Sequence, residues 1–327
     1  MQYLDKLSAV ARMNELGSRR LPFVFVVNYD GSKTIILSEE EIDPTSFQYA
    51  FNGVGNAPKA TPSRSLEFSW TLTPPSYEEY ARSFEVVQRA IAAGETSLVN
   101  LTCRVPVQTN LSLEEIFLHA DARYRLWIKD TMVCFSPEIF VQIRDGEIAS
   151  YPMKGTIPAL TPEAAQQLLD DPKETAEHAD VVALITADLA KVATGVHTVR
   201  YRYIDTLHTH KGDLLETSSE VRGTLAPDFH HHLGDILYTQ LPAGSITGYP
   251  KGRSIDVITR AENYTRDFYT GVMGRWDGYF LDTGVLIRFI DQVDGQLYFK
   301  AGGGVTAQSR CQAEYDEVIA KVYVPLC

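Results

Sequence analysis

The chain has 327 residues, of which 42 are acidic and 30 are basic, and its formal net charge at pH 7 is −12. This balance argues against a nucleic-acid-binding protein, which would carry a basic stripe. No apolar run approaches the ~18 residues of a membrane-spanning helix, so no membrane association is expected. The 4 cysteines are scattered without metal-ligand spacing, and we expect a soluble, reduced, cytoplasmic protein.

The first part of the chain predicts a buried strand followed by a linker. Residues 21–27 are a continuous apolar run, which is typical of a buried strand. Residues 53–76 are rich in Gly, Pro, Ser and Thr and predict a linker. Whether the first 75 residues are an appendage or an integral edge of the fold is open from the pattern alone.

Two capping signals then predict helices. Ser76 precedes Glu79 by three residues, which is a capping box, and Gly94 is placed to end this helix. Ser112 and Glu115 repeat the pattern. The remaining predicted elements are a strand at 99–107, strands within 126–152, a helix near 173–193, a strand near 198–205, a helix at 254–264, strands at 285–291 and 296–301, and a helix near 311–322. Strands and helices that alternate without a regular βαβ repeat predict an α+β protein with large antiparallel sheets.

Paired carboxylates recur on two of the predicted helices. Glu174 and Glu177 stand at i, i+3 and share a helix face, and Glu314 and Glu317 repeat the spacing with Lys321 one turn further on. Two such helices could hold Mg²⁺, which takes few protein ligands and leaves room for an anionic substrate. The alternative, that both pairs are solvated faces, stays open.

Arg288 lies in the predicted strand at 285–291, where both faces are apolar. A partly buried guanidinium needs an anion, and its fork matches a carboxylate. The partner is either an internal Asp or Glu or a ligand.

Two glycine clusters, at 242–254 and 301–309, match neither a phosphate loop nor a dinucleotide fingerprint. Each could present backbone N–H groups to a ligand or form a tight turn.

Lys154, which lies between Pro152 and Gly155, could be a fixed amine acting as nucleophile or base. An exposed turn lysine is the alternative.

Five stretches in order carry a family resemblance: PMKGT at 152–156, KETAEH at 173–178, PAGSITGYPKGRS at 242–254, YTGVMG at 269–274, and AGGGVTAQS with AEYDE within 301–317. Together they resemble the chorismate-utilising enzymes from about Ser76 to Val324. The resemblance implies one large α+β domain, with two mostly antiparallel sheets flanked by helices, and a Mg²⁺-dependent active site. It implies a catalytic domain at 76–327, with residues 1–75 as a shortened N-terminal segment integral to the fold.

The resemblance also implies residue roles on the metal side. Glu177 and Glu317 match the Mg²⁺-binding glutamates, and Glu174 and Glu314 match nearby supporting carboxylates. Glu138 matches the general acid that protonates the departing C4 hydroxyl of chorismate.

Further positions match the substrate-binding residues of the family. Arg288 and Tyr269 match the pair that holds the enolpyruvyl carboxylate, and Lys321 matches a lysine in that neighbourhood. Ser245, Thr247 and Gly302 match segments that line the substrate.

Two positions indicate which reaction the resemblance implies. Leu98 stands where isochorismate and salicylate synthases carry a water-activating lysine, and Lys154 stands where anthranilate synthases usually have alanine. The pattern is that of aminodeoxychorismate synthase component I, in which the lysine attacks C2 of the ring and ammonia then adds at C4. The implied partners are chorismate and either free ammonia or a glutamine amidotransferase subunit, and no pyridoxal or nucleotide is implied.

The chain also departs from the family pattern. The usual D-L-x-R-N-D-L run reads Ala183 to Leu189 with its first Asp, Arg and Asn lost, and Glu216 replaces an expected histidine. Two alternatives therefore stay open: an anthranilate- or isochorismate-forming enzyme, and a degenerate, non-catalytic relative.

Overall fold

The computed structural model describes residues 2–58, 67–209 and 212–326. The chain forms two compact units, each built around one sheet. The first unit comprises Met1–Glu39, Ile139–Ser245 and Val272–Gly284, and the second comprises Glu40–Glu138, Ile246–Gly271 and Val285–Cys327. Residues 1–75 enter both units, and the predicted boundary at residue 76 stays a prediction.

The sheet of the first unit has the strand order β11-β13-β10-β9-β16-β15-β1-β2, with β12 also paired to β13. Its pairings between described residues are antiparallel. The strands are β1 (Phe23–Val27), β2 (Thr34–Ser38), β9 (Ile139–Arg144), β10 (Glu147–Ser150), β11 (Met153–Pro158), β12 (Thr194–Thr209), β13 (Gly212–Thr224), β15 (Val272–Trp276) and β16 (Phe280–Val285).

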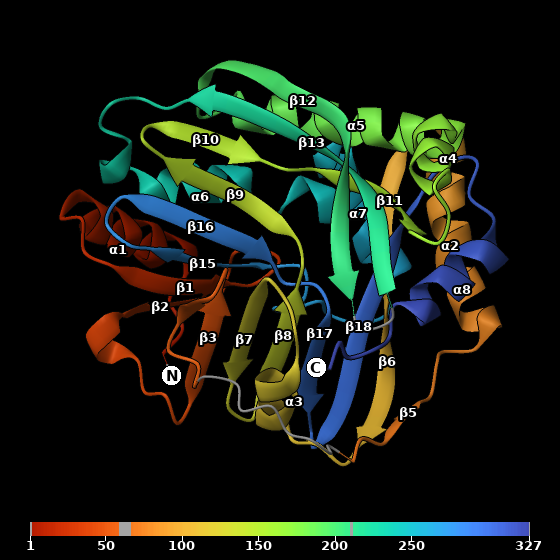
Figure 1. Ribbon diagram of the computed structural model, residues 1–327, viewed down its shortest axis with the longest axis horizontal. Helices are drawn as coiled ribbons and strands as arrows, with labels where there is room; N and C mark the ends of the chain where they lie inside the picture. Colours follow the sequence, from red (N-terminus) through yellow and green to blue (C-terminus); the bar gives the residue numbers. More distant parts are fainter. Residues whose placement is uncertain (1, 59–66, 210–211, 327) are drawn as a thin grey trace. The chain divides into compact units, whose positions relative to one another are not determined.

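The helices of the first unit are α1 (Lys6–Ser18), α4 (Ala164–Asp170), α5 (Pro172–Leu189) and α6 (Leu233–Gln240), with a 3₁₀ turn at η2 (Phe229–His231). Helix α5 runs along β12 and β13 (Figure 1). It begins at Asp171, whose side chain accepts hydrogen bonds from the N–H groups of Lys173 and Glu174, and Pro172 occupies its first position. Both features favour a helix start, so the carboxylates that follow are held on a well-defined first turn.

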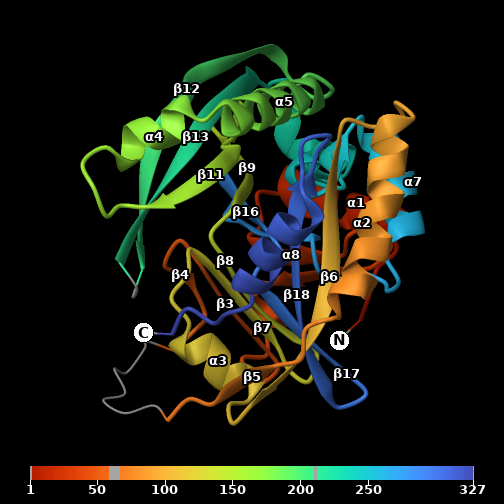
Figure 2. The same cartoon turned by 90° about the vertical axis from the view of Figure 1, so that its right-hand side faces the viewer.

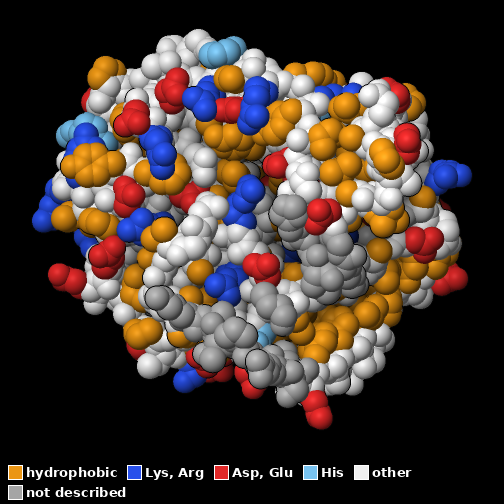
Figure 3. Space-filling view, in the orientation of Figure 1, with side chains coloured by type: hydrophobic (Ala, Val, Ile, Leu, Met, Phe, Trp, Pro, Cys, Tyr) orange, Lys and Arg blue, Asp and Glu red, His pale blue; other side chains and the backbone are white. Residues whose placement is uncertain are grey.

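A cluster of three oppositely charged side chains lies on β12 and β13. Glu220 binds Arg200 at 3.2 Å and Arg222 at 2.5 Å between side-chain N and O atoms. Basic and acidic side chains gather over these two strands in Figure 3.

The sheet of the second unit has the order β14-β6-β18-β17-β8-β7-β3-β4, with β5 also paired to β6. Its described pairings are likewise antiparallel. The strands are β3 (Phe47–Phe51), β4 (Val54–Gly55), β5 (Trp70–Leu72), β6 (Leu98–Thr109), β7 (Tyr124–Ile128), β8 (Met132–Ser136), β14 (Gly248–Tyr249), β17 (Phe289–Val293) and β18 (Gln296–Val305).

The helices of the second unit are α2 (Tyr77–Ala92), α3 (Leu113–His119), α7 (Lys251–Ala261) and α8 (Cys311–Ala320). Helices α2 and α7 lie side by side against β6 (Figure 2). Both predicted capping boxes are present, at Ser76 with Glu79 and at Ser112 with Glu115. The α2 stripe of Tyr80, Phe84 and Val87 is buried against the sheet, which stabilises the fold by about 1.5–3 kcal/mol for each large side chain.

The predicted α+β class with two antiparallel sheets and flanking helices is confirmed. Of the predicted linker at 53–76, residues 59–66 lie outside the described residues, and Trp70–Leu72 form the short strand β5. No helix in the described part of the chain is long and apolar enough to cross a membrane.

One predicted strand, at 285–291, is wrong. Strand β16 ends at Val285 and β17 begins at Phe289, and the chain bends between them. Arg288 has φ 51°, the left-handed conformation that breaks a strand. In this bend the N–H of Leu286 bonds to the Gly271 carbonyl oxygen at 2.8 Å, so pairing to a distant segment replaces the ladder.

Candidate active site

Lys154 lies on β11 of the first unit and is held by a bulge. It is in register with Thr217 of β13, whose hydroxyl donates a hydrogen bond to the Lys154 carbonyl oxygen. The register shifts at Gly155, where φ is +70°. A Cβ atom at Gly155 would lie 2.8 Å from a carboxylate oxygen of Glu174. Glycine therefore permits both the left-handed backbone and the close approach of Glu174.

The Lys154 amine faces Glu177, a residue of α5. Its Nζ lies 3.9 Å from Glu177 Oε2, and Lys173 Nζ lies 3.7 Å from the other carboxylate oxygen. The side chains of Lys154 and Glu177 are 19% and 10% exposed, so solvent screens their attraction less than it would at the surface. The first unit thus brings Lys154, Glu174 and Glu177 together.

His178, which directly follows Glu177 on α5, is a buried histidine that the sequence pattern did not predict as a site residue. It is fully buried, and its Nε2 is 2.6 Å from the Ser219 hydroxyl oxygen. Burial, with smaller effects of Arg202 and Lys154, lowers the pKa of His178 to about 4. The imidazole is therefore neutral at pH 7. The available signal was its place directly after Glu177.

In the second unit, α8 presents its predicted residues to the glycine cluster of β18. Lys321 Nζ donates to the Gly302 carbonyl oxygen at 3.0 Å and lies 2.7 Å from Glu317 Oε1. Glu314 is 2% exposed and accepts a hydrogen bond from Ser309 at 2.7 Å. A Cβ atom at Gly303 would lie 3.7–3.8 Å from Glu314, Glu317 and Lys321. Because Gly303 has no side chain, a small space remains beside it that Glu314, Glu317 and Lys321 face, and we call this space the Gly303 cradle.

Arg288 and Tyr269 lie near the same end of this sheet. Arg288 donates from Nη1 to the Lys321 carbonyl oxygen at 3.4 Å, and its guanidinium lies 5.3 Å from the Tyr323 ring centroid. Tyr269 is 3% exposed and its ring centroid lies 5.8 Å from that of Phe289. Burial raises the pKa of the Tyr269 hydroxyl far above its usual range, so the phenol remains a donor.

Three further predicted residues lie on segments between the strands. Glu138 follows β8 and its N–H donates to the Ser136 hydroxyl oxygen at 3.1 Å. Thr247 is fully buried in the second unit, and its carbonyl oxygen accepts from the Asn100 N–H at 2.8 Å. Ser245 is partly exposed and belongs to the first unit, within the 3₁₀ turn η3 (Gly244–Ile246).

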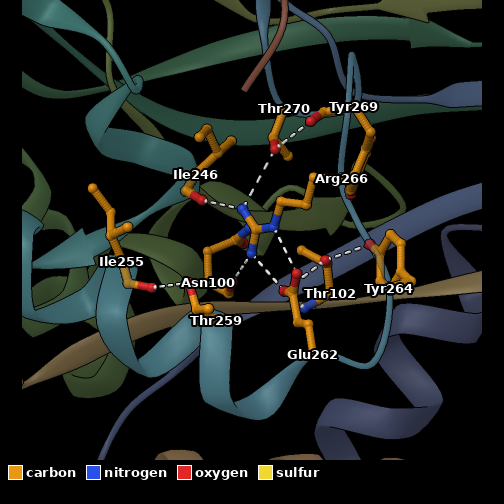
Figure 4. A network of polar contacts seen from close by, with 10 residues as sticks. All are labelled: Asn100, Thr102, Ile246, Ile255, Thr259, Glu262, Tyr264, Arg266, Tyr269 and Thr270. Carbon is orange, nitrogen blue, oxygen red and sulfur yellow. Dashed lines mark hydrogen bonds and ion pairs between the residues drawn. The ribbon is translucent and has the colours of Figure 1, made fainter. Parts of the chain in front are cut away.

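Glu262 and Arg266 form a buried ion pair that the sequence pattern did not predict. The side chains are 3% and 2% exposed, and Nη2 and Oε1 are 2.6 Å apart. Figure 4 shows the guanidinium reaching the backbone carbonyl oxygens of Ile246 and Asn100 as well. The i, i+4 spacing was the only local signal, and it does not distinguish a buried pair from a surface pair.

The carboxylates fit a hard divalent cation of the kind expected. Among the described residues no three His, Cys, Asp or Glu side chains form a metal group. The first unit offers Glu174 and Glu177, and the second offers Glu314 and Glu317 beside the Gly303 cradle. Mg²⁺ takes one or two carboxylates and completes its shell with water and substrate oxygens, so such a sparse oxygen set suits it.

The positions that depart from the family pattern differ in burial: Ala183 and Ala187 of α5 are exposed, Thr186 is half-buried and Glu216 is buried. Leu98 is 5% exposed and pairs with Tyr249 in β14. Glu216 is 6% exposed on β13, opposite Thr156 of β11. Asp188 of α5, at the end of the altered run, pairs with Lys191 at 2.6 Å.

Comparison with known proteins adds to this geometry. The chain is 42% identical over 317 residues to an uncharacterized PabA-like protein of Haemophilus influenzae, covering 97% of this chain and 96% of the relative. It is 30% identical over 315 residues to aminodeoxychorismate synthase component 1 of Salmonella typhimurium, covering 92% of this chain and 67% of that protein.

The fold is shared with a solved structure of lower identity. The menaquinone-specific isochorismate synthase MenF of Escherichia coli superposes with a TM-score of 0.75 at 15% identity, covering 98% of this chain and 82% of that chain. Residues 18–326 match the chorismate binding enzyme family. With this match spanning nearly the whole sequence, the chain belongs to the family of chorismate binding enzymes.

Proposed function

We propose that the chain is an aminodeoxychorismate synthase component I, which converts chorismate and ammonia into 4-amino-4-deoxychorismate. The observation that carries the proposal is Lys154, held at the β11 bulge with its amine 3.9 Å from Glu177. Leu98, buried where a water-activating lysine would mark isochorismate synthase, supports it. The likeness to the Salmonella typhimurium enzyme supports the same reaction.

In the proposed reaction Lys154 is the nucleophile. Its amine attacks C2 of the chorismate ring, the C1=C2 and C5=C6 double bonds become C1=C6 and C4=C5, and the C4–O bond breaks. Hydroxide is a poor leaving group, so Glu138 donates the proton that lets it depart as water. Ammonia then attacks C4, both double bonds shift back, and the C2–N bond breaks as the proton that ammonia loses returns to the departing Lys154 amine.

The other proposed residues bind and orient the dianionic substrate. Arg288 and Tyr269 hold one carboxylate through a guanidinium fork and a phenol that stays protonated. Glu177 and Glu317, with Glu174 and Glu314 in support, are the proposed ligands of Mg²⁺, which when bound supplies positive charge for the second substrate carboxylate.

The source of ammonia is the proposed partner. The Salmonella typhimurium relative is named a component 1, and a second component would be a glutamine amidotransferase subunit that releases ammonia. We expect product with ammonium salts in the absence of any partner, and product with glutamine only when that subunit is added.

An assay of the purified chain tests the reaction. It contains chorismate, Mg²⁺ and ammonium, and the products are separated by chromatography. We expect 4-amino-4-deoxychorismate. Anthranilate or isochorismate as the main product would replace this reaction with another of the family, and chorismate left unconsumed would favour a non-catalytic relative.

A further inference from the structure

We propose that Arg266 and Glu262 form a positioning pair that aligns three substrate-binding segments of the second unit. This inference rests on the proposed function, because it takes Thr247, Tyr269 and Gly302 as substrate contacts. Neither Arg266 nor Glu262 touches the substrate in this proposal; each acts through the backbone that it holds.

The Arg266 guanidinium binds the nearby Glu262 carboxylate and backbone acceptors from two other stretches of chain. Its Nη1 donates to the Ile246 carbonyl oxygen at 2.9 Å, and its Nη2 donates to the Asn100 carbonyl oxygen at 2.7 Å. Its Nε and Nη2 also bind both carboxylate oxygens of Glu262 at 2.8 and 2.6 Å. One planar group with five N–H donors can satisfy all four acceptors together, whereas the three donors of an ammonium cannot.

Each stretch held by Arg266 adjoins a proposed substrate residue (Figure 4). Ile246 directly precedes Thr247, and the Thr247 carbonyl oxygen is bound by the Asn100 N–H at 2.8 Å. Arg266 Nη1 also lies 3.4 Å from the Thr270 hydroxyl, which donates to the Tyr269 carbonyl oxygen at 2.5 Å. The guanidinium therefore links the loop with Thr247 to the segment with Tyr269.

Glu262 extends the same contact to the glycine cluster. One of its oxygens accepts from the N–H of Thr102 at 2.9 Å and from its hydroxyl at 2.7 Å. Thr102 is in register with Gly302 across β6 and β18, and a Cβ atom at Gly302 would lie 2.5 Å from the Thr102 methyl carbon. Glu262 thus fixes the strand position against which Gly302 packs.

Stability alone does not explain a pair buried this deeply. Two charges with at most 3% exposure lose most of their hydration, and replacing such pairs by apolar residues is often neutral or stabilising. What apolar residues could not supply is directional bonds to the backbone of Ile246 and, on β6, to that of Asn100 and Thr102. A second buried pair, Lys300 with Asp291 at 2.6 Å, braces the Arg266 carbonyl oxygen at 3.0 Å.

The test compares two arginine-to-lysine variants by chorismate-binding titration. Arg266→Lys keeps the charge but loses the fork. Arg125→Lys is the matched control, because Arg125 also donates to two carbonyl oxygens of the second unit, those of Phe117 and Ala120, which adjoin no proposed substrate residue. We expect the Kd for chorismate to rise at least tenfold in Arg266→Lys and less than twofold in Arg125→Lys.

A double-mutant cycle with Tyr269→Phe separates positioning from general loosening. If Arg266 acts through Tyr269, Arg266→Lys should raise the Kd at least threefold less in the Tyr269→Phe background than in the wild type. Arg125→Lys should act equally in both backgrounds. Should Arg266→Lys fail to fold, Glu262→Gln, which keeps one oxygen for Thr102, should raise the Kd at least threefold.

A folded Arg266→Lys or Glu262→Gln variant that binds chorismate within twofold of wild type would overturn the inference. So would strictly additive effects in the cycle. Binding is measured without turnover. A wild-type chain that binds chorismate but forms another product would therefore contradict the amination proposal and leave the positioning inference intact.

Discussion

At the scale of single residues, the proposed reaction depends on Lys154. Substituting alanine removes the nucleophile but leaves Arg288 and the carboxylates in place. We expect Lys154→Ala and Lys154→Arg to reduce formation of aminodeoxychorismate from ammonium by roughly a thousandfold or more, because a guanidinium stays protonated. The Kd of both variants for chorismate should remain within about threefold of the wild-type value, because the residues that bind the substrate before it reacts are unchanged.

Lys173→Ala is the matched control for this prediction. Lys173 approaches the same Glu177 carboxylate at 3.7 Å but is 41% exposed, and its loss should cost far less activity. Product formation by Lys154→Ala at near the wild-type rate would contradict covalent catalysis.

His178 predicts a pH dependence of stability. Its pKa is about 4 in the folded chain because burial disfavours the charged ring, whereas the unfolded chain binds that proton near the ordinary pKa of about 6.5. As the pH falls from 6.5 towards 4, the unfolded state gains a proton first and the free energy of unfolding decreases. The lost stability is about 1 kcal/mol at pH 5.5 and a few kcal/mol by pH 4.

Denaturant unfolding in EDTA at pH 7.5, 6.5 and 5.5 measures this effect. His178→Gln should unfold with a shallower pH dependence than wild type. Equal slopes for wild type and His178→Gln would show that this imidazole is not kept neutral by the fold.

At the scale of elements, α8 and β18 meet at two adjacent glycines with different roles. A Cβ atom at Gly303 would make only ordinary contacts, at 3.7–3.8 Å, with Glu314, Lys321 and Glu317. Gly303→Ala should therefore keep its melting temperature within about 2 °C while raising the Mg²⁺ concentration needed for half-maximal activity at least fivefold. The reason is that the methyl group occupies the space that these carboxylates face.

Gly302→Ala, at the neighbouring glycine, should instead lower the stability of the fold. In Gly302→Ala the new Cβ would lie 2.5 Å from the Thr102 methyl carbon and 2.8 Å from the Leu101 carbonyl oxygen, which should cost about 1–3 kcal/mol of stability through overpacking. Activity of Gly303→Ala at the wild-type Mg²⁺ concentration would contradict the assignment of the cradle.

At the scale of the whole molecule, the proposed metal ligands come from helices that are far apart in the sequence. Glu177 lies on α5 and Glu317 on α8. We expect Glu177→Ala and Glu317→Ala each to abolish turnover and the thermal shift caused by Mg²⁺, without unfolding the chain. Glu147→Ala, at an exposed ion pair of the first unit, is the control and should keep both. Full activity in EDTA, or an active Glu317→Ala, would sink the metal assignment.

The local signals in the sequence determined the helices, and they supplied the residues of the proposed site. The capping boxes at Ser76 and Ser112 and the i, i+3 glutamates need only neighbours within one or two turns, and each helix forms as expected. The ordered motifs likewise indicated the family that the comparisons show. Information of this kind is readable because helix geometry fixes which nearby residues share a face.

Only the tertiary structure decided the bend at Arg288 and the burial of Glu262 with Arg266. The bend depends on pairing between Leu286 and the distant Gly271, and the ion pair depends on carbonyl oxygens that Ile246 and Asn100 supply. The physical reason is that a strand or a surface ion pair is the local expectation, and backbone acceptors far away in the chain override it once sheet pairing brings them within hydrogen-bond distance.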